Sequence, residues 1–329
     1  RELSDQGYDV TILEGNDTIG GLTVPAKMGK YTWDKFYHVI LPDDALTIEM
    51  IKFAGLEDEL SWNETRTGFY IKGAYHSMSN IIEYIKFPTL NLPDKFRLGL
   101  TILAGSKLRN YERLEKIPVT TWLKRWSGKR VYENIWHPLL KAKLGEGYKL
   151  TSAAFICATI KRLYGARKSK SRKEVFGYVN GGYAAILEGI TARLKKMGID
   201  IRTGFKVKDV STKGSSLKID ALRGESLNFD YVISTLPSHL TARVAPGLAQ
   251  EETRQLNNIK YLGVACVSLL LKKEITPYYV TNITDKRVPF TGLIEMTALV
   301  DKKIFDGLSL VYLPKYVSSE DEIFTWEED

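Results

Sequence analysis

The first apolar positions of the chain follow the pattern of a short strand. Val10, Ile12 and Leu13 carry this pattern, and the acidic Glu14 stands at its carboxyl end. The preceding R-E-L-S-D-Q-G is typical of the end of a helix that Gly7 closes at its carboxyl cap. The pattern therefore predicts a helix, a strand and a turn at the start of the chain.

The period of the apolar residues then changes several times. A strand is predicted over 29–34 and a helix over 43–54, which ends at Gly55. Alternating residues around a Gly73-Ala74 turn predict a β-hairpin over 64–78. A helical block follows, about 90 residues long, which is much more than a connecting loop needs. Its helices are expected at 79–87, 93–109, 120–126, 131–144 and 152–163.

The second half of the chain reads as a helix followed by strands. Gly181-Gly182 opens the helix, and Gly198 ends it. Strands are predicted at 199–202, 206–210, 216–221, 229–237, 264–271, 289–297 and 308–313. The strand over 229–237 ends in T-L-P, where the proline is expected to begin a helix.

Length and composition indicate a globular protein of two domains. The chain has 329 residues, of which 44% are hydrophobic. No apolar run approaches the roughly 20 residues that span a bilayer, so membrane insertion is disfavoured. Cys157 and Cys266 lie in apolar surroundings and are expected to be free thiols, which suits a cytoplasmic location. The four histidines are scattered, so no metal site is predicted.

The net charge of +8 is concentrated in one run. The run consists of Arg167, Lys168, Lys170, Arg172 and Lys173. It is either a solvated loop or an electrostatic collar for an anionic substrate, a lipid-linked substrate or a membrane surface. Nucleic acid is disfavoured as a partner, because the run has no interleaved aromatic residues.

The spacing between Glu14 and the pair Gly20-Gly21 indicates cofactor chemistry. A carboxylate at the end of such a strand accepts hydrogen bonds from the two hydroxyls of an adenosine ribose, and the glycines let the backbone pass close to the cofactor. In a dinucleotide-binding unit a glycine-rich loop precedes the acidic strand by about 20 residues. Only Arg1 to Gly7 come before Tyr8, so we expect the chain to be truncated at its amino end.

Three features in this order resemble the flavin-containing amine oxidase superfamily across nearly the whole chain. They are Glu14 with Gly20-Gly21, the helix from Gly181-Gly182 that leads to Val207, and the strand ending in T-L-P. The resemblance implies a bound FAD in an extended pose. It places Glu14 on the ribose, Gly20, Gly21 and Leu22 beside the cofactor, and the Val207 backbone against the adenine. The family's Gly-Asp flavin motif has no counterpart, so truncation is expected at the carboxyl end too.

The chain departs from the family pattern at three places. Leu22 stands where many members have arginine, and Phe36 replaces the glycine of a D-x-G-x-H pattern that Asp34 and His38 otherwise match. By a rough alignment Ala265 replaces the lysine of amine oxidases, which argues against oxygen-driven amine oxidation. His38 is the catalytic candidate, as a proton carrier; its alternative is a structural histidine.

The sequence thus predicts an α/β protein. A Rossmann-like FAD-binding domain with a discontinuous sheet is expected over 1–42 and 174–258, and a substrate domain with a helical insert over 43–173 and 259–329. The expected function is that of an FAD-dependent oxidoreductase acting on a small organic substrate in the cytoplasm, with peripheral membrane contact considered. The alternatives are a flavin-dependent isomerase of a nucleotide sugar, like UDP-galactopyranose mutase, and a non-catalytic binding protein.

Overall fold

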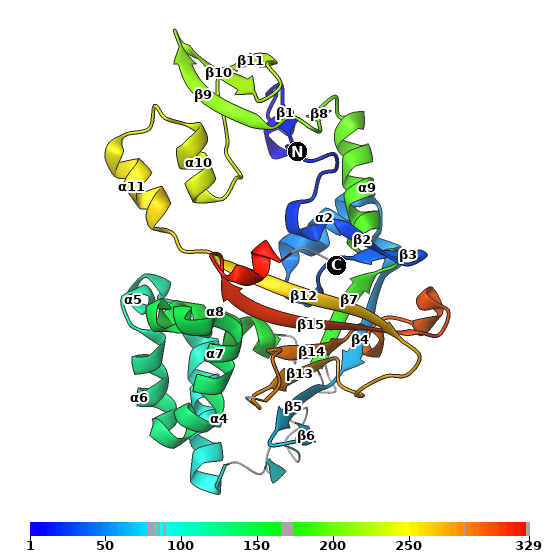
Figure 1. Ribbon diagram of the computed structural model, residues 1–329, viewed down its shortest axis with the longest axis vertical. Coiled ribbons are helices and arrows are strands. Elements are labelled where there is room, and N and C mark those ends of the chain that lie inside the picture. The colour runs from blue at the N-terminus through cyan, green and yellow to red at the C-terminus, as the bar shows by residue number, and fades with distance from the viewer. Residues whose placement is uncertain (78–82, 84–85, 88–89, 166–173, 286, 327–329) are drawn as a thin grey trace. The chain divides into compact units, whose positions relative to one another are not determined.

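The computed structural model describes residues 1–77, 83, 86–87, 90–165, 174–285 and 287–326 (Figure 1). The basic run at 167–173 and most of the helix expected at 79–87 lie outside the described residues. The chain forms two compact units. Unit 1 comprises Arg1–Val24 and Ile186–Tyr261, and unit 2 comprises Pro25–Ala185 and Leu262–Asp329.

Unit 1 begins with the elements that the opening pattern predicted. Helix α1 (Glu2–Asp5) ends before Gly7, whose φ of +89° suits glycine at a helix end. Strand β1 (Thr11–Leu13) pairs in parallel with β8 (Asp200–Arg202). Between these strands in sequence, helix α9 (Gly182–Lys196) is followed by Gly198, as predicted. Residues 182–185 of this helix belong to unit 2, and the rest belongs to unit 1.

A three-stranded antiparallel sheet completes unit 1. It has the order β11-β10-β9, with β9 at Val207–Lys213, β10 at Ser216–Ala221 and β11 at Ser226–Phe229. A small core holds the sheet, because Phe205, Ile219 and Ala221 are buried together. Helices α10 (Ser238–Val244) and α11 (Gln250–Asn258) follow.

The strand predicted over 229–237 is wrong beyond Phe229. The chain is irregular from Tyr231 to Leu236, and no described strand pairs with it. Tyr231 is 79% exposed and Ile233 is 72% exposed. A β-prone segment becomes a strand only where a neighbour accepts its backbone hydrogen bonds, and within the described residues this one has none.

A six-stranded sheet forms the centre of unit 2 (Figure 1). Its order is β12 (Leu262–Leu271), β15 (Ser309–Ser318), β14 (Gly292–Glu295), β13 (Val280–Ile283), β5 (Thr67–Ile71) and β6 (Ala74–Ser77). The predicted hairpin is β5–β6, although its turn is Lys72-Gly73, both with positive φ.

Two smaller strand pairs belong to the same unit. Strands β2 (Pro25–Met28) and β3 (Tyr31–Asp34) form a hairpin, and β4 (Leu60–Thr65) pairs with β7 (Glu174–Val179). The predicted helix is α2 (Ala45–Ala54), and Gly55 ends it in the left-handed conformation. Short turns of helix connect these elements: η1 (Gly21–Thr23, in unit 1), η2 (Glu57–Glu59), η5 (Met296–Ala298), η6 (Lys302–Phe305) and η7 (Glu322–Thr325).

The predicted helical block is present beside the sheet (Figure 1). It comprises α4 (Leu92–Lys107), α5 (Tyr111–Glu115), α6 (Val119–Val131), a π-helical turn (Tyr132–Trp136), α7 (His137–Leu144), η4 (Gly145–Leu150) and α8 (Ala153–Gly165). Its core includes Val119, Leu123 and Val131, all fully buried. The Gly145-Glu146-Gly147 segment lies in η4 after α7, as a connection between helices.

The compact units differ from the predicted domains at three boundaries, the smallest difference being residues 259–261, which lie in unit 1 instead of the predicted substrate domain. Residues 25–42 and 174–185 were expected in the FAD-binding domain, and they pack within unit 2. The assignment of the two domains to cofactor and substrate stays a prediction. None of the helices in the described part of the chain has the length and apolarity to cross a membrane.

Candidate functional site

Glu14 occupies the carboxyl end of β1, where the sequence placed it. Its backbone N–H donates to the Arg202 carbonyl at 2.9 Å and so continues the parallel pairing with β8. One carboxylate oxygen, Oε1, accepts the backbone N–H of Asn16 at 2.8 Å and the Asn16 amide at 2.9 Å. These bonds fix the carboxylate in an Asx-like turn and leave Oε2 without a hydrogen bond to any described residue.

The segment before Val207 lies directly beside Glu14. Phe205 donates its backbone N–H to the Glu14 carbonyl at 2.9 Å, and the Lys206 side chain approaches Gly15 closely. Val207 begins β9, and its side chain packs on the small core of unit 1. The fold therefore brings Glu14 and Val207 to one edge of unit 1, while the backbone role predicted for Val207 stays a prediction.

The two glycines of the Gly20-Gly21 pair meet different surroundings. Gly20 has a φ of +126°, and a Cβ there would lie 2.6 Å from Cδ1 of Leu187 on α9. Gly21 has a φ of +54°, and a Cβ there would meet no described atom within 4 Å. Leu22 next to it is 74% exposed. Gly20 thus packs the turn against α9, and Gly21 and Leu22 present an open surface.

These residues fit the adenosine end of FAD. Oε2 of Glu14 can accept a ribose hydroxyl, and the backbone at Gly21 is open to close approach by a ligand. The cofactor-binding roles of Glu14, Gly20, Gly21, Leu22 and Val207 are predictions that rest on this fit.

Asp34 is the last residue of β3 in unit 2, and its buried carboxyl group lies at the first turn of α9. It is 2% exposed, and its Oδ1 accepts the Tyr183 backbone N–H at 2.7 Å. Burial raises the pKa of Asp34 to about 7, although the bond from Tyr183 opposes the shift. Gly182 makes room for this contact, because a Cβ there would lie 2.8 Å from Oδ1.

Two tyrosines that are distant in sequence enclose Asp34: Tyr312 of β15 and Tyr279, which directly precedes β13. The Tyr312 hydroxyl donates to the Asp34 carbonyl at 2.6 Å. The Tyr279 hydroxyl is buried and has no hydrogen-bond partner among the described residues. Burial first, and then the Asp34 charge, raises the pKa of both tyrosines. Asp34 is thus surrounded by groups that stay neutral.

His38 lies next to this cluster. Its ring centre is 5.0 Å from that of Tyr183. Burial lowers the pKa of His38, and its Nδ1 is buried without a hydrogen-bond partner in the described chain. A void of about 10 Å³ is lined by His38, Asp34, Gly182 and Tyr183, among others, and has room for about one water molecule. This setting suits either role predicted for His38, proton carrier or structural histidine.

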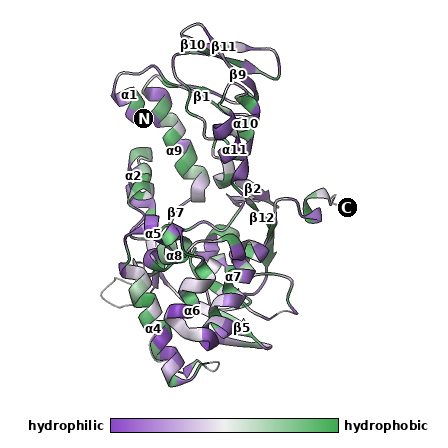
Figure 2. Cartoon of the chain, turned by 90° about the vertical axis from the view of Figure 1, so that its left-hand side faces the viewer, coloured by the Kyte–Doolittle hydropathy of each residue, from purple (hydrophilic) through white to green (hydrophobic). Residues whose placement is uncertain are grey.

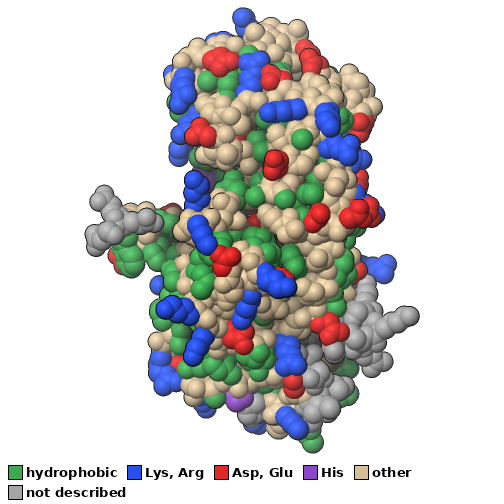
Figure 3. All heavy atoms as spheres, turned by 90° about the vertical axis from the view of Figure 1, so that its right-hand side faces the viewer, with side chains coloured by type: hydrophobic (Ala, Val, Ile, Leu, Met, Phe, Trp, Pro, Cys, Tyr) green, Lys and Arg blue, Asp and Glu red, His purple; other side chains and the backbone are tan. Residues whose placement is uncertain are grey.

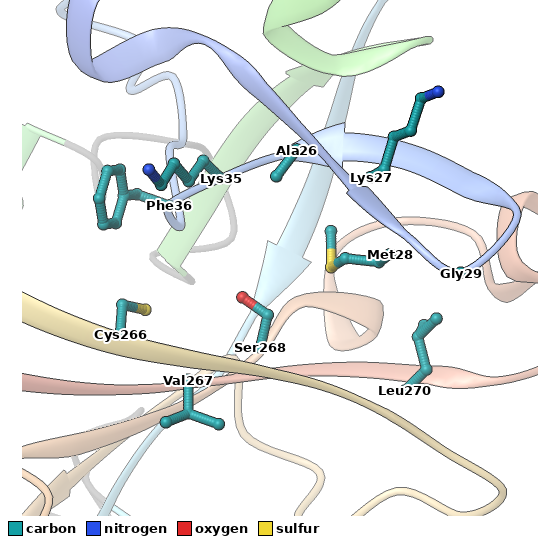
Figure 4. A pocket seen from close by; sticks show the side chains of 10 residues that line it. All are labelled: Ala26, Lys27, Met28, Gly29, Lys35, Phe36, Cys266, Val267, Ser268 and Leu270. Carbon is teal, nitrogen blue, oxygen red and sulfur yellow. The ribbon is translucent and has the colours of Figure 1, made fainter. Parts of the chain in front are cut away.

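A larger pocket of about 600 Å³ opens between the β2–β3 hairpin and β12 (Figure 4). Cys266, Ser268 and Leu270 alternate along β12 and point into it, whereas Val267 points away. The opposite wall is lined by Ala26, Lys27, Met28, Gly29, Lys35 and Phe36. The Lys27 side chain points away from β12 (Figure 4). The pocket thus combines apolar walls with a hydroxyl, a thiol and one ammonium group, that of Lys35.

The polar groups of the pocket are neutral or cationic. Burial raises the pKa of the Cys266 thiol to about 11, so the thiol is protonated at neutral pH. The Lys35 ammonium lies 5.8 Å from the centre of the Phe36 ring. No group of three or more potential metal ligands occurs in the described chain. The pocket therefore suits a small apolar molecule with a neutral or anionic polar group.

Ala265 has a lysine directly opposite in the sheet. It pairs with Lys315 of β15. Because β12 alternates, Ala265 lies on the face of the strand opposite that of Cys266. The replacement of a catalytic lysine by Ala265 stays a prediction.

Sequence reasoning noted Asp34 and missed its burial. The D-x-G-x-H match flagged the residue, but its surroundings come from α9, Tyr279 and Tyr312, all far away in sequence. A signal was present in Gly182, because a glycine at a helix start accommodates a close contact. Tyr37, whose hydroxyl pairs with that of Tyr316, was missed as well, and no local pattern announces it.

Comparison with known proteins shows which family the chain resembles. The family of flavin-containing amine oxidoreductases matches residues 1–297. Protoporphyrinogen oxidase 1, chloroplastic, of Arabidopsis thaliana is 21% identical over 302 residues, which cover 82% of this chain and 55% of that protein. The flavin-dependent L-tryptophan oxidase of Lentzea aerocolonigenes is 23% identical over 308 residues, covering 81% of this chain and 61% of that protein.

Solved structures show the same fold. An oxidoreductase from Methanosarcina mazei superposes with a TM-score of 0.73 at 16% identity, covering 98% of this chain and 77% of that one. A reduced UDP-galactopyranose mutase superposes with a TM-score of 0.71 at 18% identity, covering 96% of this chain and 71% of that one. These similarities confirm the predicted α/β fold.

The chain belongs to the family of flavin-containing amine oxidoreductases. The predicted family and the predicted FAD cofactor are thereby confirmed. The matches span 55% and 61% of the lengths of the two curated relatives.

Proposed function

We propose that the protein is an FAD-dependent oxidoreductase that acts on a small organic substrate. The observation that carries this proposal is the Glu14 carboxylate, held by Asn16 at the end of a parallel strand with one oxygen unused and the open Gly21 backbone nearby in sequence. FAD supplies two-electron redox chemistry when bound, and the protein supplies orientation and exclusion of water.

The pocket beside β12 is the proposed substrate site. Its volume of about 600 Å³ falls in the range of small-molecule sites. Its walls are mainly apolar, and Lys35 and Ser268 provide a cation and a hydroxyl for a polar group of the substrate. We propose more specifically that the substrate is anionic, because the Lys35 ammonium can pair with a negative group. None of the ten lining residues is an arginine, so the arginine pair that would favour a nucleotide-sugar isomerase is not part of this pocket.

Two further expectations stay proposals. A lipid-linked substrate rested on the basic run at 167–173, which lies outside the described residues. A cytoplasmic location rests on Cys157 and Cys266, both free thiols.

The first test is Glu14→Ala, measured by the dissociation constant of FAD. Each charge-assisted hydrogen bond to the ribose contributes roughly 1.5 to 3 kcal/mol, so we expect FAD to bind at least about tenfold more weakly. Glu251→Ala on α11 is the matched control, because this carboxylate pairs with Arg254 on the surface. Unchanged FAD affinity in Glu14→Ala, with an unchanged melting temperature of the apoprotein, would remove Glu14 from the site.

The reaction class is tested by the absorbance spectrum of the holoprotein. Anaerobic addition of a donor panel should bleach the flavin band for the true substrate of an oxidoreductase. Turnover of UDP-galactopyranose after chemical reduction, without bleaching by any donor, would instead favour the isomerase. A colourless protein that takes up no FAD would favour the non-catalytic alternative.

A further inference from the structure

Helix α4 carries an apolar stripe on its outer side. The stripe consists of Leu92, Phe96, Leu100 and Leu103, which are 70%, 69%, 43% and 40% exposed. Their spacing of four, four and three residues places them on one face of the helix. Single exposed apolar side chains are common on protein surfaces, but a row of four on one helix forms a continuous patch.

The stripe does not belong to the core of the helical block. The opposite face of α4 does, because Asp94, Leu98, Thr101 and Gly105 are its buried residues. Gly105 packs against α8 so closely that a Cβ there would lie 3.0 Å from Cδ1 of Ile160. The inner face of α4 therefore packs in the block without the outer stripe. Figure 2 shows hydrophobic and hydrophilic residues following one another along α4.

Cations flank the stripe. Lys95, Arg97 and Lys107 belong to α4, and Arg109 follows it. The one acidic residue of α4, Asp94, is 8% exposed and pairs with Arg130 of α6 at 3.1 Å. The exposed surface of α4 is thus apolar along its middle and cationic at its edges.

The whole helical block is strongly cationic. Residues 90–165 contain 15 lysines and arginines and only 5 aspartates and glutamates, while the complete chain has a net charge of +8. On the face drawn in Figure 3, basic and acidic side chains are interspersed. Positive charge is therefore concentrated in the block that carries the stripe.

We propose that α4 docks the protein on an anionic lipid surface. Leucine and phenylalanine on one face with lysine and arginine beside them are the residues of a helix that lies in the membrane interface. A second copy of the chain fits less well, because its own cationic block would meet the first with like charge. The proposal is independent of the redox function, since it uses no residue of the pocket or of the FAD-binding edge.

The test is sedimentation of the holoprotein with vesicles. Phosphatidylcholine vesicles with about 30 mol % phosphatidylserine provide the anionic surface, and pure phosphatidylcholine vesicles provide the neutral one. We expect binding to the anionic vesicles only, and weaker binding when salt is raised, because exposed charges are then screened. The double variant Leu92→Gln/Phe96→Gln should reduce the partition coefficient about tenfold or more, since it removes the two most exposed apolar side chains.

A matched control keeps the test specific. Leu46→Gln/Leu222→Gln removes two side chains of similar exposure, 78% and 62%, outside α4. This control should bind vesicles like the wild type, and Arg97→Gln/Lys107→Gln should lose the preference for anionic over neutral vesicles. Vesicle binding that is equal in wild type and Leu92→Gln/Phe96→Gln would overturn the proposal. A second outcome would also overturn it. In that outcome the wild type dimerises without lipid, Leu92→Gln/Phe96→Gln is a monomer, and none of the variants binds vesicles.

Discussion

Asp34 holds its carboxyl group in a place that favours the protonated form. The Tyr183 N–H supplies one hydrogen bond, and burial outweighs it, so the pKa of Asp34 rises from 3.8 to about 7. Between these two pH values the folded chain binds more protons at Asp34 than the unfolded chain does. The free energy of unfolding therefore falls as pH rises through this window.

The Asp34→Asn variant should remove this pH dependence. Asparagine keeps the oxygen that accepts the Tyr183 N–H and carries no charge. At pH 8 we expect the free energy of unfolding of the variant to exceed that of the wild type by up to about 4 kcal/mol, so the variant should melt at a higher temperature. Near pH 4 the two proteins should differ little. Thermal melts across this pH range measure it, and Asp17→Asn on the surface is the control. Parallel pH profiles of Asp34→Asn and wild type would contradict the assignment.

The positions of single residues were predictable where they depend on local sequence alone. Glu14 and Gly20 follow from the spacing within one short segment, and the structure places both as that spacing requires of a strand end and a tight turn. The burial of Asp34 was not predictable, because Tyr279 and Tyr312 reach it from segments more than 240 residues further along the chain.

At the scale of elements, the turn at Gly20-Gly21 depends on one glycine more than on the other. Both have positive φ, but only Gly20 faces a side chain, that of Leu187 on α9. A Cβ at Gly20 adds a steric clash to the backbone strain, whereas a Cβ at Gly21 adds strain alone.

We therefore expect Gly20→Ala to destabilise the fold more than Gly21→Ala. Strain in this region of φ costs on the order of 1 to 3 kcal/mol, and displacement of Leu187 adds to it at position 20. Urea denaturation of the apoprotein gives both free energies. If Leu187→Ala restores the free energy of unfolding that Gly20→Ala loses, the clash with Leu187 is supported. Equal destabilisation by Gly20→Ala and Gly21→Ala would contradict the clash.

Elements with their own end signals were predictable, and elements that need partners were not. Helix α2 and the β5–β6 hairpin carry caps and turn residues within their own sequence. The segment 231–236 has the composition of a strand but no described neighbour to pair with, so composition alone misled the prediction. The hairpin partner β2 was missed because Pro25 and Lys27 interrupt its apolar pattern.

At the scale of the whole molecule, each compact unit has its own core. Ile219 lies in the core of unit 1, and Leu123 lies in the core of the helical block in unit 2. Separate cores predict unfolding in more than one step.

Core truncations should therefore act on different transitions. Ile219→Ala and Leu123→Ala each remove a buried side chain, at about 2 to 5 kcal/mol apiece. In differential scanning calorimetry we expect each variant to lower one transition and to leave the other in place. A single transition that both variants lower equally would show that the two units unfold together.

The uneven charge of the molecule also decides how it behaves on an ion exchanger. The helical block holds an excess of ten positive charges, and the rest of the chain, with 32 basic and 34 acidic residues, is nearly balanced. A resin senses the patch nearest to it, since charges beyond about 8 Å are screened at physiological salt. Retention on a sulfonate column therefore depends mainly on the helical block, which faces the beads. The isoelectric point of about 9.1, in contrast, averages the charges of this block with those of the rest of the chain.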